Sequence, residues 1–85
     1  MNEQDLATQA DALPERFADR LEASDLADVR SLADGGEWSE EIDVLLACLQ
    51  EAGQRVTSAE RHELAALLDY MQMPHDRLDA IKVAG

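Results

Sequence analysis

Apolar residues recur at three- and four-residue intervals along most of the chain, and this spacing constrains the fold more than any other feature. Leu6, Ala10, Leu13, Phe17 and Leu21 are separated by four, three, four and four positions, which places them on one face of an α-helix. The apolar residues are mostly Leu and Ala, with only two Ile and four Val. This mixture favours helices over strands, so we expect an all-α protein.

Proline, glycine and capping residues divide this pattern into separate helices. Pro14 removes a backbone donor, so we expect a frayed segment over about 1–12 and a firmer helix that continues to about Ala23. Ser24 is the expected N-cap of a short second helix. The pair Gly35-Gly36 ends that helix, because glycine accepts the left-handed conformation that closes a helix.

The second half of the chain repeats the same pattern. We expect a third helix from about Glu37 to Ala52, with Trp38, Ile42, Leu45, Leu46 and Leu49 buried. Thr57 and Glu60 have the spacing of a capping box and open a fourth helix. Pro74 precedes a short closing helix that contains Leu78, Ile81 and Val83. The 85 residues therefore predict one domain, 1–85, folded as a compact bundle of four to five short antiparallel helices.

The sequence offers little for catalysis or for metal binding. His62 and His75 are isolated from each other and from cysteine, and they lack the spacing of a zinc site. Cys48 lies in an apolar run, where a buried inert thiol is expected. We therefore predict no enzymatic activity, no metal and no cofactor.

The formal net charge of −12 bears directly on possible partners. Residues 1–43 contain 13 acids and three arginines, so the first half of the chain carries most of the negative charge. Such a surface repels nucleic acid and anionic membranes and favours a basic protein partner. No apolar run is long enough to span a bilayer, and no signal peptide is recognisable. We expect a cytoplasmic protein, with a monomer favoured.

The segment DGGEWSEEID, residues 34–43, is the candidate binding site. Residues 31–54 contain six acids and no base, so these charges have no local counterpart. Acids in a first turn also stabilise a helix by themselves, and a tryptophan at that place can simply cover the core. We predict a partner-binding surface formed by Asp28, Asp34, Glu37, Trp38, Glu40, Glu41 and Asp43.

Several segments resemble a known family of small helical proteins. They are Leu13-Pro14, Asp25 to Leu32, Gly36-Glu37-Trp38, Ile42 to Leu49, Val56-Thr57 and Met71 to Leu78. Over residues 13–83 the chain resembles immunity proteins of the MafI type, which belong to bacterial polymorphic toxin systems. The resemblance implies that the partner is a cognate toxin, often a nuclease with a basic cleft.

Two other classes remain open from the sequence. Ser24-Asp25-Leu26 stands at a helix start, where acyl carrier proteins have the order Asp-Ser-Leu and carry a prosthetic group on the serine. A carrier predicts a mass increment on Ser24. A regulatory helical subunit that docks through an apolar groove predicts binding that is insensitive to salt, whereas an acidic surface predicts strong salt dependence.

Overall fold

The structure, a computed structural model, describes residues 1–84, and all regular elements in this range are helical. In chain order they are α1 (Glu3–Arg16), the 3-10 turn η1 (Ala18–Arg20), α2 (Ala23–Asp34), α3 (Trp38–Glu51), α4 (Ser58–Tyr70) and α5 (Asp76–Asp79). The helices α1 to α4 have 12 to 14 residues each, whereas α5 has four. The prediction of a small all-α bundle is confirmed.

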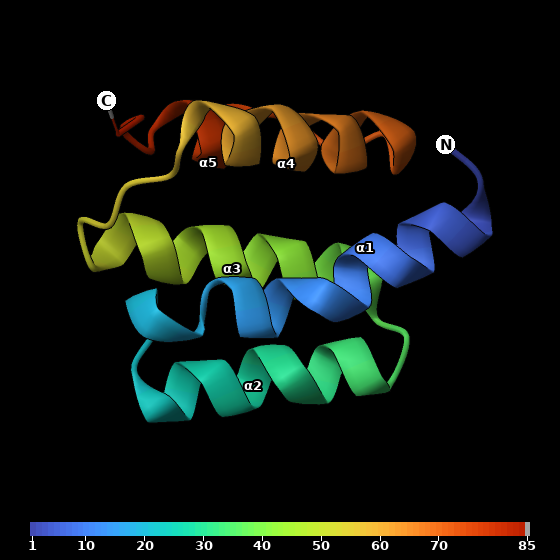
Figure 1. Cartoon of the computed structure of the whole chain (residues 1–85), viewed down its shortest axis with the longest axis horizontal. Coiled ribbons are helices and arrows are strands. Elements are labelled where there is room, and N and C mark those ends of the chain that lie inside the picture. The colour runs from blue at the N-terminus through green and yellow to red at the C-terminus, as the bar shows by residue number, and fades with distance from the viewer. Residues whose placement is uncertain (85) are drawn as a thin grey trace.

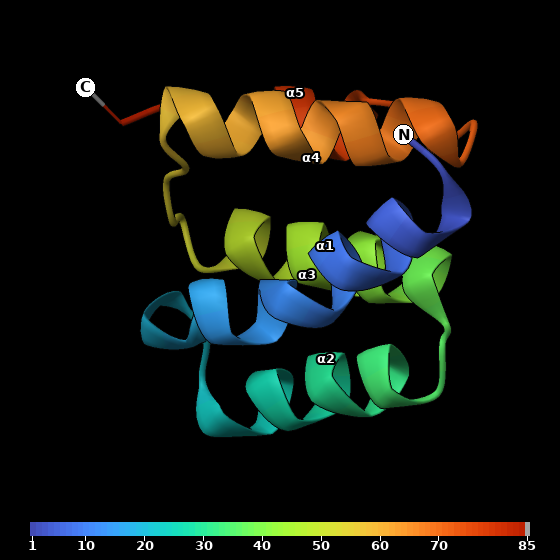
Figure 2. The ribbon, with the colours of Figure 1, turned by 45° about the vertical axis from the view of Figure 1, so that its right-hand side comes forward.

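The helices form three layers (Figure 1). Helix α2 is one outer layer, α1 and α3 lie beside each other in the middle, and α4 with α5 forms the opposite outer layer; Figure 2 shows the same order from another side. Consecutive long helices run in opposite directions, as short connections require. Helix α2 therefore has one face against the middle layer and one face open to solvent.

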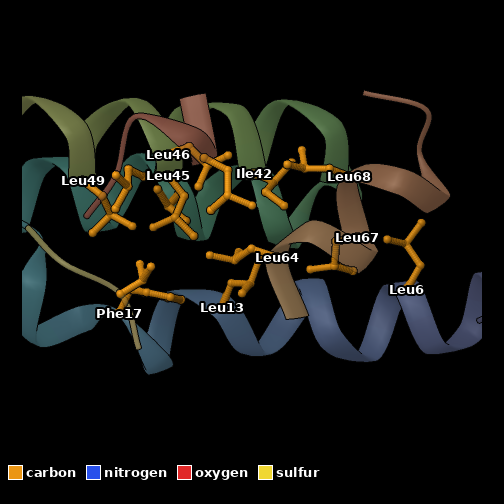
Figure 3. Packing of buried hydrophobic residues seen from close by; sticks show 14 residues of the cluster. Leu6, Leu13, Phe17, Ile42, Leu45, Leu46, Leu49, Leu64, Leu67 and Leu68 are labelled. Carbon is orange, nitrogen blue, oxygen red and sulfur yellow. The ribbon is translucent and has the colours of Figure 1, made fainter. Parts of the chain in front are cut away.

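The core lies where α1, α3 and α4 meet, and the side chains labelled in Figure 3 come from these helices and from Phe17 at the end of α1. Helix α2 adds Val29 to the cluster. The predicted apolar faces of the first and third helices point into it, together with Leu64, Leu67 and Leu68 of α4. Trp38 and Leu21 pack against the cluster and are half-buried. The buried residues of the cluster are Leu6, Leu13, Phe17, Val29, Ile42, Leu45, Leu46, Leu49, Val56, Leu64, Leu67, Leu68, Leu78 and Ile81.

The N-terminal region differs from the expectation. Residues 3–12 are helical, and Asn2 and Asp5 form a capping box that starts α1 at Glu3. Helix α1 also continues through Pro14, which lies near its C-terminal end, so the missing donor costs only one late hydrogen bond. The helix does not extend to Ala23, since the chain turns through η1 and Leu21 is extended.

Helix α2 begins two residues earlier than predicted, because its N-cap is Glu22 and not Ser24. Its first residue is Ala23, Glu22 occupies the N-cap position without a side-chain hydrogen bond, and Ser24 lies inside the first turn. Ser24 is therefore not the cap. The first turn still contains Asp25, whose carboxylate complements the helix dipole.

The end of the chain also differs from the expectation. Helix α5 is a single turn that ends at Asp79, and Val83 pairs with Val56 in an isolated parallel bridge instead of continuing a helix. Val56 N–H donates to the Lys82 carbonyl at 3.1 Å, and Ala84 N–H donates to the Val56 carbonyl at 2.7 Å. A β-branched residue such as valine suits this extended pairing. The Thr57–Glu60 capping box, by contrast, is present as predicted.

Gly36 makes the turn between α2 and α3, and its replacement gives a first prediction. Its φ is +70°, and a Cβ there would meet no atom within 4 Å, so the cost of alanine is purely conformational. We expect Gly36→Ala to lower the free energy of unfolding by about 1–2 kcal/mol in urea denaturation. Gly35→Ala is the matched control, because the φ of Gly35 is −82°. Equal losses in both variants would contradict this explanation.

Candidate protein-binding surface

The two helices α2 and α3 and their connection form an acidic hairpin. Residues 22–51 contain nine acids and one base, Arg30. That base points away from the hairpin's own acids: its Nε donates to the Glu15 carboxylate of α1 at 2.9 Å. The hairpin therefore supplies no base that neutralises its own carboxylates.

Five other ion pairs of the described chain connect α1, η1 or α3 with the α4–α5 layer or lie within that layer, and one joins the adjacent residues Asp19 and Arg20. Arg16 pairs with Glu63, Arg20 with Glu60, Arg61 with Asp79, and Arg77 of α5 with Asp43 of α3. None reaches the open face of α2. Within residues 1–84, seven acids of the hairpin have no ion-pair partner, and we name this set the acidic hairpin surface: Glu22, Asp25, Asp28, Asp34, Glu37, Glu40 and Glu51.

The structure places four predicted site residues on this surface. Asp28, Asp34, Glu37 and Glu40 are all exposed, the first two on α2 and the others at the start of α3. Asp43 is exposed too, but its carboxylate accepts from Arg77 Nε at 2.9 Å and is partly neutralised. It therefore contributes less negative charge than the other four.

Trp38 lies half-buried at the first residue of α3 and packs against the core cluster. Its indole Nε1 is buried and has no hydrogen-bond partner in the described structure. Both properties agree with the other interpretation of this tryptophan, in which the side chain covers the core. Only part of the ring is then accessible to a partner.

The prediction for Glu41 was wrong, because this residue is fully buried, with a relative exposure of 0%. It lies three residues after Trp38 and four before Leu45, and so belongs to the inward face of α3. Neither carboxyl oxygen has a hydrogen-bond partner. Burial raises the pKa of Glu41 to about 8, and the negative charge of Asp11 adds to the shift. The carboxyl is mostly protonated at neutral pH and cannot serve as a surface charge.

A hollow of about 480 Å³ lies at the end of the hairpin where α2 starts and α3 ends. Three members of the acidic hairpin surface line it, Glu22, Asp25 and Glu51, together with Asp19 and the thiol of Cys48. Burial and the charge of Asp25 raise the pKa of the Cys48 thiol, which keeps it protonated and unreactive. Sequence reasoning missed this place, because its residues come from two segments, 19–25 and 48–54, that are distant in the chain.

Sequence reasoning also missed the role of Arg20. Its Nη1 and Nη2 donate to the two Glu60 oxygens at 2.8 and 2.6 Å, and Nη1 also donates to the Arg55 carbonyl at 3.0 Å. The guanidinium lies 4.3 Å above the centre of the Phe17 ring. These contacts hold the pKa of Glu60 at about 2 and raise that of Arg20. The link anchors the end of the α1–η1 segment to the start of α4.

Neither histidine joins a cluster of ligands. His75 Nε2 lies 2.7 Å from the Asp69 carboxylate, while His62 is exposed. In the part of the chain that the structure covers, no group of three or more His, Cys, Asp or Glu side chains is arranged to hold a metal ion. No helix in this part combines the length and the apolar character that crossing a bilayer requires.

The fold and its surface define an acidic all-helical bundle in which one hairpin carries negative charges without ion-pair partners. Comparison with protein families, with curated proteins and with solved structures finds no match to this chain.

Proposed function

We propose that this chain is a cytoplasmic immunity protein that binds a cognate toxin with a basic surface and acts as a non-enzymatic, monomeric inhibitor. The observation that carries the proposal is the acidic hairpin surface, where seven carboxylates without ion-pair partners share two adjacent helices. Self-repulsion of this kind destabilises a small domain, and a basic partner removes it.

The arrangement of charges favours the hairpin, and not the rest of the molecule, as the surface that a basic partner contacts. On the opposite layer, every carboxylate of α4 and α5 except that of Asp76 is engaged by a base of the protein, as in Arg61–Asp79 and Arg16–Glu63. Helix α2 has a free outer face that is open along its whole length (Figure 1). A partner that meets α2 and the start of α3 contacts Asp28, Asp34 and Glu37 without disturbing an internal ion pair.

The mechanism follows from the charge of this surface. A nuclease toxin has a basic cleft that attracts phosphates, and an acidic helical face attracts the same cleft. Occupation of the cleft excludes the nucleic acid, and electrostatic attraction raises the association rate. An interface of ordinary size buries about 1,600 Å², which is a large share of the protein's total accessible surface of 4965 Å².

The test begins with a pull-down from the native cell lysate at low and at moderate salt, with mass-spectrometric identification. We expect a basic partner that dissociates as salt rises, and whose toxicity co-expression of this chain abolishes. Recovery of biosynthetic enzymes, or of no protein, would exclude the proposal.

Charge reversal on the hairpin gives a second prediction. Asp28→Lys is expected to weaken binding of the captured partner by about tenfold, mainly through slower association at low salt. Asp76→Lys is the matched control, because Asp76 is an exposed acid without an ion pair in residues 1–84 and belongs to α5 in the opposite layer. Surface plasmon resonance measures both variants. Equal losses would show that net charge, and not the hairpin, determines binding.

A further inference from the structure

Glu41 and Trp38 hold the buried side-chain atoms that lack hydrogen bonds in the described chain. These atoms are Glu41 Oε1, Glu41 Oε2 and Trp38 Nε1. The two residues are three positions apart on α3, so their side chains leave the same side of the helix. An unpartnered carboxyl inside a small core is costly, and such a group requires a physical explanation.

No base compensates Glu41 from the helices that pack around α3. Arg30 of α2 is bonded to Glu15, Arg16 of α1 is paired with Glu63, and Arg77 of α5 is paired with Asp43. The charge that acts on Glu41 is the carboxylate of Asp11, which is negative as well and raises the pKa of Glu41 further. The remaining ionisable groups on α1, α2 and α5 are all acids: Glu3, Asp5, Glu15, Asp25, Asp28, Asp34, Asp76 and Asp79. Helix α4, which packs into the same core, carries Glu60, Arg61, His62, Glu63, Asp69 and Tyr70; its Arg61 is paired with Asp79, and its His62 is exposed.

Helix α1 is attached to the rest of the protein unevenly. Its C-terminal end is held by ion pairs of Glu15 and Arg16, and η1 adds the Arg20–Glu60 link. Residues 3–13 have no ion pair with another helix of the described chain and are held by the buried side chains of Leu6, Ala10 and Leu13. Pro14 separates the two parts and cannot donate a hydrogen bond to the Ala10 carbonyl.

We propose that residues 3–13 of α1 form a detachable arm with its hinge at Pro14, and that Glu41 is the proton-controlled latch that holds this arm against α3. The arm is docked while Glu41 is neutral and is released when Glu41 loses its proton. The proposal does not depend on the identity of any partner.

The direction of the pH dependence follows from burial. Glu41 has a pKa of about 8 when the arm is docked, and an ordinary value of 4.5 once water reaches it. A rise in pH between these values favours the open state by about tenfold per pH unit, and outside this range the effect disappears. The docked arm is therefore most stable in acid.

Amide hydrogen exchange followed by NMR tests the latch at pH 5.5, 6.5 and 7.5, with each rate corrected for its intrinsic pH dependence. We expect the protection factors of the amides from Leu6 to Leu13 to fall about tenfold per pH unit. At pH 7.5 these amides should be at least tenfold less protected than those of Leu64, Leu67 and Leu68 in α4, because the arm opens without global unfolding.

Two variants isolate the group responsible. Glu41→Gln keeps the shape of the side chain and cannot ionise, so it should remove the pH dependence in residues 6–13. Glu40→Gln is the matched control. Glu40 is an exposed neighbour of Glu41, so removing its charge should leave the pH dependence of the protection factors unchanged. Asp11→Asn should move the upper end of the slope to lower pH.

Three results would overturn the latch. Equal protection of the α1 and α4 amides at pH 7.5 would mean that Glu41 becomes exposed only on global unfolding. A flat pH profile in the unmodified protein would mean that Glu41 stays uncharged throughout. A slope that survives in Glu41→Gln would assign the dependence to another group.

Discussion

Glu41→Gln is expected to raise the free energy of unfolding by about 3 kcal/mol at pH 7. The folded protein holds this carboxyl at a pKa of about 8, against an ordinary value of 4.5. At pH 7 Glu41 is therefore ionised in the unfolded chain but mostly protonated in the folded protein, and this difference favours the unfolded chain. Glutamine cannot ionise and presents a similar uncharged group, so the variant removes this term and little else.

The same cause determines how the gain varies with pH. A carboxyl with a raised pKa destabilises the fold progressively as pH rises from 4.5 to about 8 and by a constant amount above that range. The advantage of Glu41→Gln should therefore vanish near pH 4.5 and be largest near pH 8. Urea denaturation at pH 5, 6, 7 and 8 measures the profile. Glu40→Gln should change stability by less than about 0.5 kcal/mol throughout. A gain that is the same at pH 5 and pH 8 would refute the ionisation argument.

Arg20→Ala is expected to lower the free energy of unfolding by about 2–3 kcal/mol at pH 7. The substitution leaves Glu60, whose side chain is only 12% exposed, without its guanidinium partner, and it removes the contact with the Phe17 ring. The hydrogen bonds from Arg20 hold the pKa of Glu60 at about 2. Their contribution is complete above pH 4.5 and is lost as pH falls towards 2.

Arg61→Ala is the matched control for this prediction. Arg61 also pairs with a carboxylate, Asp79, but both side chains are more exposed, at 36% and 58%. Solvent screening should limit its loss to less than about 1 kcal/mol. Thermal or urea denaturation at pH 7 and pH 3 compares the two variants. A loss from Arg20→Ala that is as small as that from Arg61→Ala would show that burial adds nothing to the Arg20–Glu60 link.

The helices were predictable because their signals are local. The apolar spacing in residues 42–49 and 64–68 identifies buried faces, and the Thr57–Glu60 capping box marks the start of α4 at the correct residue. The limits of α1 and α2 were less predictable. Pro14 indicated a break, but its late position in the helix and its burial in the core allow the helix to continue.

The exposed carboxylates of the hairpin were predictable only in part, because acid content does not specify which carboxylates reach solvent. Asp28, Asp34, Glu37 and Glu40 were placed correctly at the surface. Glu41 was assigned to the same group on composition, although its spacing from Trp38 and Leu45 places it on the buried face. The partner of Asp43 was hidden, since Arg77 lies 34 residues later in the chain.

The bridge between Val56 and Val83 has a practical consequence for handling the protein. It holds the last described residues against the α3–α4 connection, in a layer opposite to α2 (Figure 1). A chain immobilised through its C-terminal end would thus expose α2 to the solution, while an N-terminal attachment would place the support beside the start of α1. The point of attachment therefore decides whether a biosensor presents the hairpin freely or restrains the first helix.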